Sequence, residues 1–128
     1  VWLSKNRDRR HLFGKVNRSP ILQGLLRRFG PAAPTFNGHN TSAWKQDICS
    51  VNGFDERMAY GGLDRELGER MTNNGVKGVS VRYDAILAHQ WHGRPYATDE
   101  SWRLNSAIRA DVKAQKTRWT EWGIEHGR

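Results

Sequence analysis

The chain has 128 residues, of which 37% are hydrophobic, and its formal net charge is +8. This length suits one modest domain, and no apolar run approaches the length that a membrane-spanning helix needs. A basic domain attracts polyanions such as nucleic acid, anionic lipid surfaces or nucleotide phosphates, so the charge alone does not choose the partner.

The first predicted elements are a basic connecting segment over residues 1–18 and a helix over 19–29. Ser19 is a good N-cap residue, Pro20 suits the first helical position, and the pair at 30–31, Gly-Pro, ends the helix. An apolar stripe runs along it, formed by Ile21, Leu22, Leu25, Leu26 and Phe29. Such a stripe packs into a core, or docks onto a membrane surface or onto a missing part of the protein.

Two further helices follow, separated by a turn. A short helix is predicted over 43–51, and the Asn-Gly pair at 52–53 tolerates the left-handed conformation of a turn. A second helix begins after Gly61 and Gly62 and ends at Gly75, with apolar residues at 63, 67 and 71. Glu66 and Arg70 form a favourable i, i+4 pair on it. The single cysteine, Cys49, lies between Ile48 and Val51, which predicts a small buried residue.

Residues 76–92 predict one or two strands, because Val79, Val81 and Tyr83 alternate and a short apolar run follows. From Asp99 the pattern is helical again, and an apolar stripe is expected from Trp102, Ile108, Val112 and Trp119. The expected fold class is therefore mixed α/β, helix-rich with a short sheet. The expected organisation is a segment over 1–18, a main part over 19–98 and a helical tail over 99–128.

Five pieces of sequence in this order resemble the C-terminal, acceptor-binding half of family 2 glycosyltransferases with the GT-A fold. The segment is also similar to the galactosyltransferase C-terminal segment. The pieces are Gly38, Asn40 and Ser42; the turn from Val51 to Glu56; the stretch from Gly61 to Leu67; Arg70, Met71 and Gly75; and the run ILAHQWH at 86–92. The resemblance covers about residues 36–96 and implies part of a Rossmann-like transferase domain.

The resemblance implies that Asp64 is the general base, which takes the proton from an acceptor hydroxyl as that oxygen attacks a nucleotide sugar. The residue types fit this role, because Gly61 and Gly62 leave room beside the backbone and a carboxylate in a first helical turn stays ionised. The alternative is that Asp64 only caps the helix. One residue departs from the family pattern: Leu63 stands where the family commonly has an acid.

The resemblance also implies a divalent metal, Mn²⁺ or Mg²⁺, with His89 or His92 as a ligand, His89 being favoured. Plain surface or core histidines are the alternative. Trp44 and Trp91 are candidates for stacking on a sugar ring or for core packing, and Asn40 for substrate contact or an ordinary turn. The sequence lacks the Asp-x-Asp motif that the nucleotide-binding half of the family supplies.

The expected function is therefore transfer of a sugar from a nucleotide-sugar donor to a saccharide or lipid-linked acceptor, inverting and metal-dependent, of the bacterial polysaccharide type. We expect a cytoplasmic protein, possibly at the inner face of the membrane, that self-associates or meets a partner supplying the missing half, with no nucleic acid as partner. Two alternatives stay open: a non-catalytic basic module that binds nucleic acid or anionic glycan, and a degenerate scaffold fragment.

Overall fold

The computed structural model describes residues 19–29, 33–81, 85 and 96–125. The chain forms two compact units, one made of Val1–Pro34 with Val79–His89 and the other of Thr35–Gly78 with Gln90–Arg128. The helices are α2 (Pro20–Phe29), α3 (Lys45–Ser50), α4 (Leu63–Asn73) and α5 (Asp99–Gln115). All four lie where the sequence predicted helices.

The predicted sheet is wrong: no strand occurs among the described residues, so this part of the chain does not adopt an α/β fold with a short sheet. Residues 76–81 form neither helix nor strand, and the rest of the predicted strand region, apart from residue 85, lies outside the described part. Val79 and Val81 are 79% and 42% exposed. Their alternation indicates an extended backbone, but a strand also needs a neighbour to bond with.

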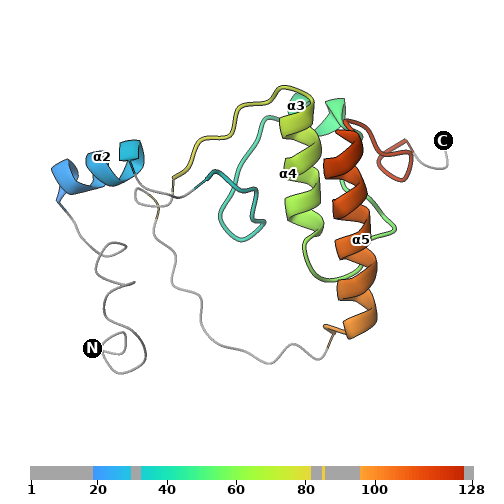
Figure 1. Ribbon diagram of the computed structural model, residues 1–128. Helices are drawn as coiled ribbons and strands as arrows, with labels where there is room; N and C mark the ends of the chain where they lie inside the picture. The colour runs from blue at the N-terminus through green and yellow to red at the C-terminus, as the bar shows by residue number, and fades with distance from the viewer. Residues whose placement is uncertain (1–18, 30–32, 82–84, 86–95, 126–128) are drawn as a thin grey trace. The chain divides into compact units, whose positions relative to one another are not determined.

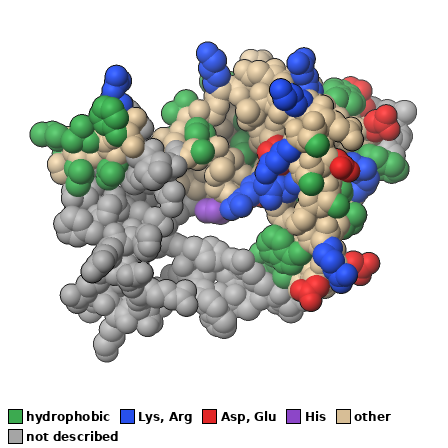
Figure 2. Space-filling model, viewed as in Figure 1, with side chains coloured by type: hydrophobic (Ala, Val, Ile, Leu, Met, Phe, Trp, Pro, Cys, Tyr) green, Lys and Arg blue, Asp and Glu red, His purple; other side chains and the backbone are tan. Residues whose placement is uncertain are grey.

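Among the described residues of the first unit, α2 is the helix, and its apolar side chains are largely exposed. Ile21, Leu25 and Phe29 are 77%, 51% and 74% exposed and recur every four residues along one stripe. Arg28 lies over the Phe29 ring, 5.7 Å from its centroid. Hydrophobic side chains cover much of the visible face of this helix, with a basic side chain beside them (Figure 2).

The second unit is organised around α4, which lies beside α5 along its length and meets α3 near its end (Figure 1). One apolar cluster joins α3 and α4 through Val51, Leu67 and Met71. A second cluster joins α4 and α5, and its buried members are Met58, Ile108 and Val112. Glu69 of α4 ties the two helices further, since it accepts hydrogen bonds from Arg109.

A fully buried ion pair lies on α4, between residues one turn apart. Glu66 and Arg70 have no exposed side-chain surface, and Arg70 Nε lies 2.6 Å from Glu66 Oε1. Arg70 also donates to the carbonyl oxygens of Val51 and Gly53. A buried charge is tolerated only when it is paired and its donors are used, and both conditions hold here. The sequence identified the pair, but its role is to anchor the turn after α3.

That turn holds the C-terminal segment, residues 116–125, against the unit. Asn52 (φ 66°) and Gly53 (φ 72°) adopt the predicted left-handed conformation. The buried Asn52 side chain donates to the Thr120 carbonyl oxygen and accepts from the Glu125 backbone N–H. A Cβ on Gly123 would lie 1.7 Å from the Asn52 carbonyl oxygen, so only glycine permits this approach.

Cys49 is exposed, so the prediction of a buried cysteine is wrong. It lies on α3, a helix of six residues, none of which is buried. Within the described ranges, none of the helices combines the length and the apolar character that crossing a bilayer requires.

Candidate functional site

The candidate site begins with two glycines that lead into α4. Gly61 (φ 110°) and Gly62 (φ 85°) both have positive φ values, and α4 starts at the next residue. Asp64 follows in the first turn, where unpaired backbone N–H groups favour a carboxylate. The sequence predicted this local arrangement, and it results from the conformational freedom that glycine alone offers at these two positions.

The Asp64 carboxylate joins two segments that are far apart in the sequence. Its Oδ2 accepts a hydrogen bond of 2.8 Å from the Gly38 backbone N–H, and its Oδ1 accepts one from the Arg65 N–H. Arg65 in turn donates to the Asn37 side chain at 3.4 Å. Asp64 thus holds the turn of residues 37–40 against the start of α4. Its side chain is half-buried, so one side still faces solvent.

Side chains from α5 fill the space beside the glycine pair. A Cβ on Gly61 would lie 3.1 Å from the Trp102 indole, and a Cβ on Gly62 would lie 3.3 Å from Arg109 Cδ. Asn105 is 1% exposed and donates to the carbonyl oxygens of Ala59 and Gly61, which fixes this loop segment to α5. The glycines therefore permit close contact with α5 as well as the sharp entry into α4.

Three aromatic rings surround the glycine pair. Tyr60 makes edge-to-face contacts with Tyr96, at 4.6 Å between centroids, and with Trp102, at 6.1 Å. Tyr96 and Trp102 are 52% and 46% exposed. Exposed aromatic faces of this kind stack on the apolar face of a sugar ring, and packed edge-to-face contacts keep them rigid. These rings lie next to the turn that precedes Asp64.

Sequence reasoning missed this aromatic group, because Trp102 was assigned to the buried stripe of the last helix. The helical spacing argues against a single stripe that contains both Trp102 and Ile108. Trp102 and Ile108 are six positions apart, which places them roughly 120° apart around a helix. Ile108 and Val112 are four apart, and both are buried. Trp119, the fourth predicted member, lies beyond the end of α5 and is 42% exposed.

The other predicted site residues are placed as follows. Asn40 belongs to the turn that Asp64 holds, and its backbone N–H donates to the Asn37 carbonyl oxygen at 2.9 Å. Trp44 precedes α3 and is 74% exposed. His89, Trp91 and His92 lie outside the described residues. The structure therefore brings Asn40, Gly61, Gly62 and Asp64 into one neighbourhood.

A metal site does not arise from the described part of the chain. No group of three His, Cys, Asp or Glu side chains there could hold a metal ion. The described residues do not fit the expected Mn²⁺ or Mg²⁺, and the two candidate ligands, His89 and His92, lie outside them.

A separate cavity is lined by residues of α5 and of the C-terminal segment, and Asp64 does not line it. Comparison with known proteins adds no assignment to either place: no family model, curated protein or solved structure matches this chain.

Proposed function

We propose that this chain is the acceptor-binding part of a glycosyltransferase that moves a sugar from a nucleotide-sugar donor to a saccharide or lipid-linked acceptor. The proposal rests on the sequence resemblance and on one structural observation. Asp64 lies two residues after a glycine pair in left-handed backbone and holds the turn of residues 37–40, and these are two of the pieces on which the resemblance depends.

The proposed chemistry is direct displacement with one general base. Asp64 accepts the proton of the acceptor hydroxyl while that oxygen attacks the anomeric carbon and the nucleotide diphosphate departs. Attack from the face opposite the leaving group inverts the anomeric configuration. The hydrogen bonds from Gly38 and Arg65 hold the carboxylate in place. General-base assistance of this kind contributes ~10²–10⁴ in rate.

The aromatic group supports the acceptor side of the proposal. Trp102 packs against Gly61 and leaves nearly half of its surface exposed, so an acceptor ring can stack beside the turn that carries the base. A sugar that stacks on a rigid ring loses less freedom when it reacts, because the ring is held before binding.

The test compares Asp64→Asn with Asp47→Asn in the full-length enzyme, assayed against a panel of nucleotide sugars with and without Mn²⁺. Asn keeps an oxygen that can accept the Gly38 N–H, so the turn is retained while the base is lost. Asp47 is a matched control, because it is also an acid in a first helical turn, that of α3. We expect kcat to fall ~10²–10⁴-fold for Asp64→Asn only.

Equal turnover by the two variants would show that Asp64 is not the general base. Product with retained anomeric configuration would exclude a mechanism with a single displacement. If no donor supports turnover but oligonucleotides or anionic glycans bind with an affinity that falls steeply as salt rises, the chain is instead a basic binding module.

A further inference from the structure

A cavity of about 320 Å³ lies between the second half of α5, the C-terminal segment and the turn that follows Asp55. Its lining includes Glu66 and Arg70, whose side chains have no exposed surface. Ile108 and Val112 of α5 contribute an apolar wall. The volume falls at the lower end of the range of small-molecule sites. None of these residues belongs to the candidate site around Asp64.

The lining is acidic, although the chain is basic. It contains four of the chain's 13 acidic residues but only two of its 21 Lys and Arg residues, which gives a formal charge of −2 against +8 for the whole chain. The charged lining residues are Asp55, Arg57, Glu66, Arg70, Asp111 and Glu121.

Both arginines are neutralised within the lining. Arg70 pairs with Glu66, and Arg57 Nη2 lies 2.6 Å from Asp55 Oδ2. Asp111 and Glu121 form no salt bridge with any described residue, and both are exposed. The excess negative charge of the lining is therefore carried by two exposed carboxylates.

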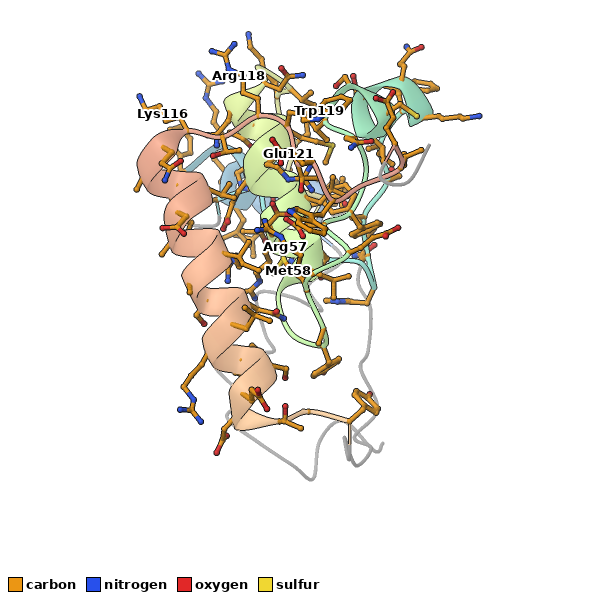
Figure 3. The ribbon with its side chains drawn as sticks, turned by 90° about the vertical axis from the view of Figure 1, so that its right-hand side faces the viewer. Arg57, Met58, Lys116, Arg118, Trp119 and Glu121 are labelled. Atoms are coloured by element: carbon orange, nitrogen blue, oxygen red, sulfur yellow. The ribbon has the colours of Figure 1, made fainter. Side chains whose placement is uncertain are left out.

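Two indole rings also belong to the lining. Trp119 and Trp122 are 42% and 39% exposed and line the cavity. The Arg57 guanidinium carbon lies 5.7 Å from the Trp122 ring centroid, so one indole here already receives a cation on its face. Figure 3 labels Arg57, Trp119 and Glu121 of the lining, together with Lys116 and Arg118, which do not line the cavity.

We propose that this cavity binds an organic ammonium ion. Two carboxylates without salt-bridge partners and the exposed indole face of Trp119 are the groups that recognise such a cation, through charge and through the negative face of the ring. An anionic ligand would meet the excess carboxylates, and the described residues offer no metal-binding group of three ligands here or elsewhere. The ammonium group belongs between Asp111 and Glu121, and its carbon substituents lie against the Trp119 ring. This inference does not depend on the glycosyltransferase proposal.

The experiment titrates the full chain with choline chloride and with D-glucosamine hydrochloride, and follows the indole N–H resonances of Trp119 and Trp122 by heteronuclear NMR. N-acetyl-D-glucosamine is the uncharged control, and sodium chloride matches the ionic strength. We expect saturable shifts with the two cations and none with the controls. Binding of choline alone identifies an alkylammonium ligand, and tighter binding of glucosamine identifies an amino sugar.

The variant Asp111→Asn/Glu121→Gln tests the carboxylates, and Asp47→Asn/Glu100→Gln removes the same charge from residues that do not line the cavity. We expect the first to weaken binding about tenfold and the second to leave it within about twofold. Thermal unfolding of both variants confirms that the fold is intact. Absence of saturable shifts, equal shifts with N-acetyl-D-glucosamine, or equal affinities of the two variants would overturn the proposal.

Discussion

At the scale of single residues, Gly61 and Gly75 are glycines for different reasons. Gly61 and Gly75 both have positive φ values, 110° and 92°. A Cβ on Gly61 would meet the Trp102 ring at 3.1 Å, whereas a Cβ on Gly75 would meet nothing within 4 Å. The pair separates two effects that usually occur together, namely the conformational cost of a side chain at positive φ and the cost of crowding a neighbour.

We expect Gly75→Ala to lower the free energy of unfolding by about 1–2 kcal/mol, which is the cost of left-handed backbone for a residue with a Cβ. Gly61→Ala adds a contact tighter than packed atoms accept, which typically costs a further ~1–3 kcal/mol. Urea unfolding of both variants measures the difference. Equal losses would mean that Trp102 moves aside freely, and the packed position of its ring would then be wrong.

Several residue-level predictions failed for one physical reason: a sequence pattern states which residues share a helix face and leaves open what covers that face. Glu66 and Arg70 have the spacing of a surface pair, yet both are fully buried. Cys49 follows an apolar residue, yet no described segment buries it on α3. Asp64 was predictable, because its position depends only on the local glycine pair and the start of the helix.

At the scale of elements, the helices were predictable because their ends are marked in the sequence. The α5 helix begins with a capping box, in which the Thr98 side chain accepts from the Ser101 N–H and Ser101 returns the bond. It ends at Lys116, which has a φ of 51°. The predicted strands had no such marker in the sequence. The alternation of Val79 and Val81 is a local pattern, whereas strand pairing depends on a second segment elsewhere in the chain.

The α2 helix is the element whose surface most needs a partner. Its exposed stripe of Ile21, Leu25 and Phe29 lies beside basic residues, a combination that favours an anionic bilayer surface. We expect Ile21→Ser/Phe29→Ser to reduce binding to anionic phospholipid vesicles about tenfold or more, because each buried apolar side chain contributes ~1.5–3 kcal/mol. Vesicle sedimentation measures the binding.

The double variant Val79→Ser/Val81→Ser is the matched control, because it removes two other exposed apolar side chains. It should bind as the unchanged chain does. Equal binding to neutral and anionic vesicles would exclude an electrostatic contribution, and unchanged binding of the α2 variant would point to another part of the protein as the partner of this stripe.

At the scale of the whole molecule, the described chain is held together by polar contacts more than by its small apolar clusters. The two clusters have three buried members each. Around them, buried polar groups connect segments that are distant in sequence, as Asn52 does for Thr120 and Glu125. Such contacts were beyond prediction, because the polar residues involved look like ordinary turn residues until a distant segment is placed on them. The aromatic group near Asp64 and the acidic cavity escaped prediction for the same reason.

The Asp55 carboxylate shows how this arrangement depends on pH. Burial by itself raises the pKa of Asp55, but hydrogen bonds from Arg57 and from the Thr120 hydroxyl outweigh that effect and hold the pKa below its ordinary value of 3.8. The same contact raises the pKa of Arg57. A carboxyl group with a lowered pKa stabilises the fold above its ordinary pKa, and this contribution is lost as the pH falls through the value in the folded state.

We therefore expect Asp55→Asn to be less stable by about 1–3 kcal/mol near neutral pH, since hydrogen bonds to a charged group are lost. The difference should shrink as the pH falls below about 4, because the unchanged chain then loses the same contribution. Urea unfolding at several pH values measures it, with Asp111→Asn, an exposed acid without a salt bridge among the described residues, as the control. A difference that is constant with pH would show that Asp55 acts through its shape rather than its charge. The C-terminal segment would then be held by its other contacts, such as those of Asn52 and the hydrogen bond from the Glu56 N–H to the Trp122 carbonyl oxygen.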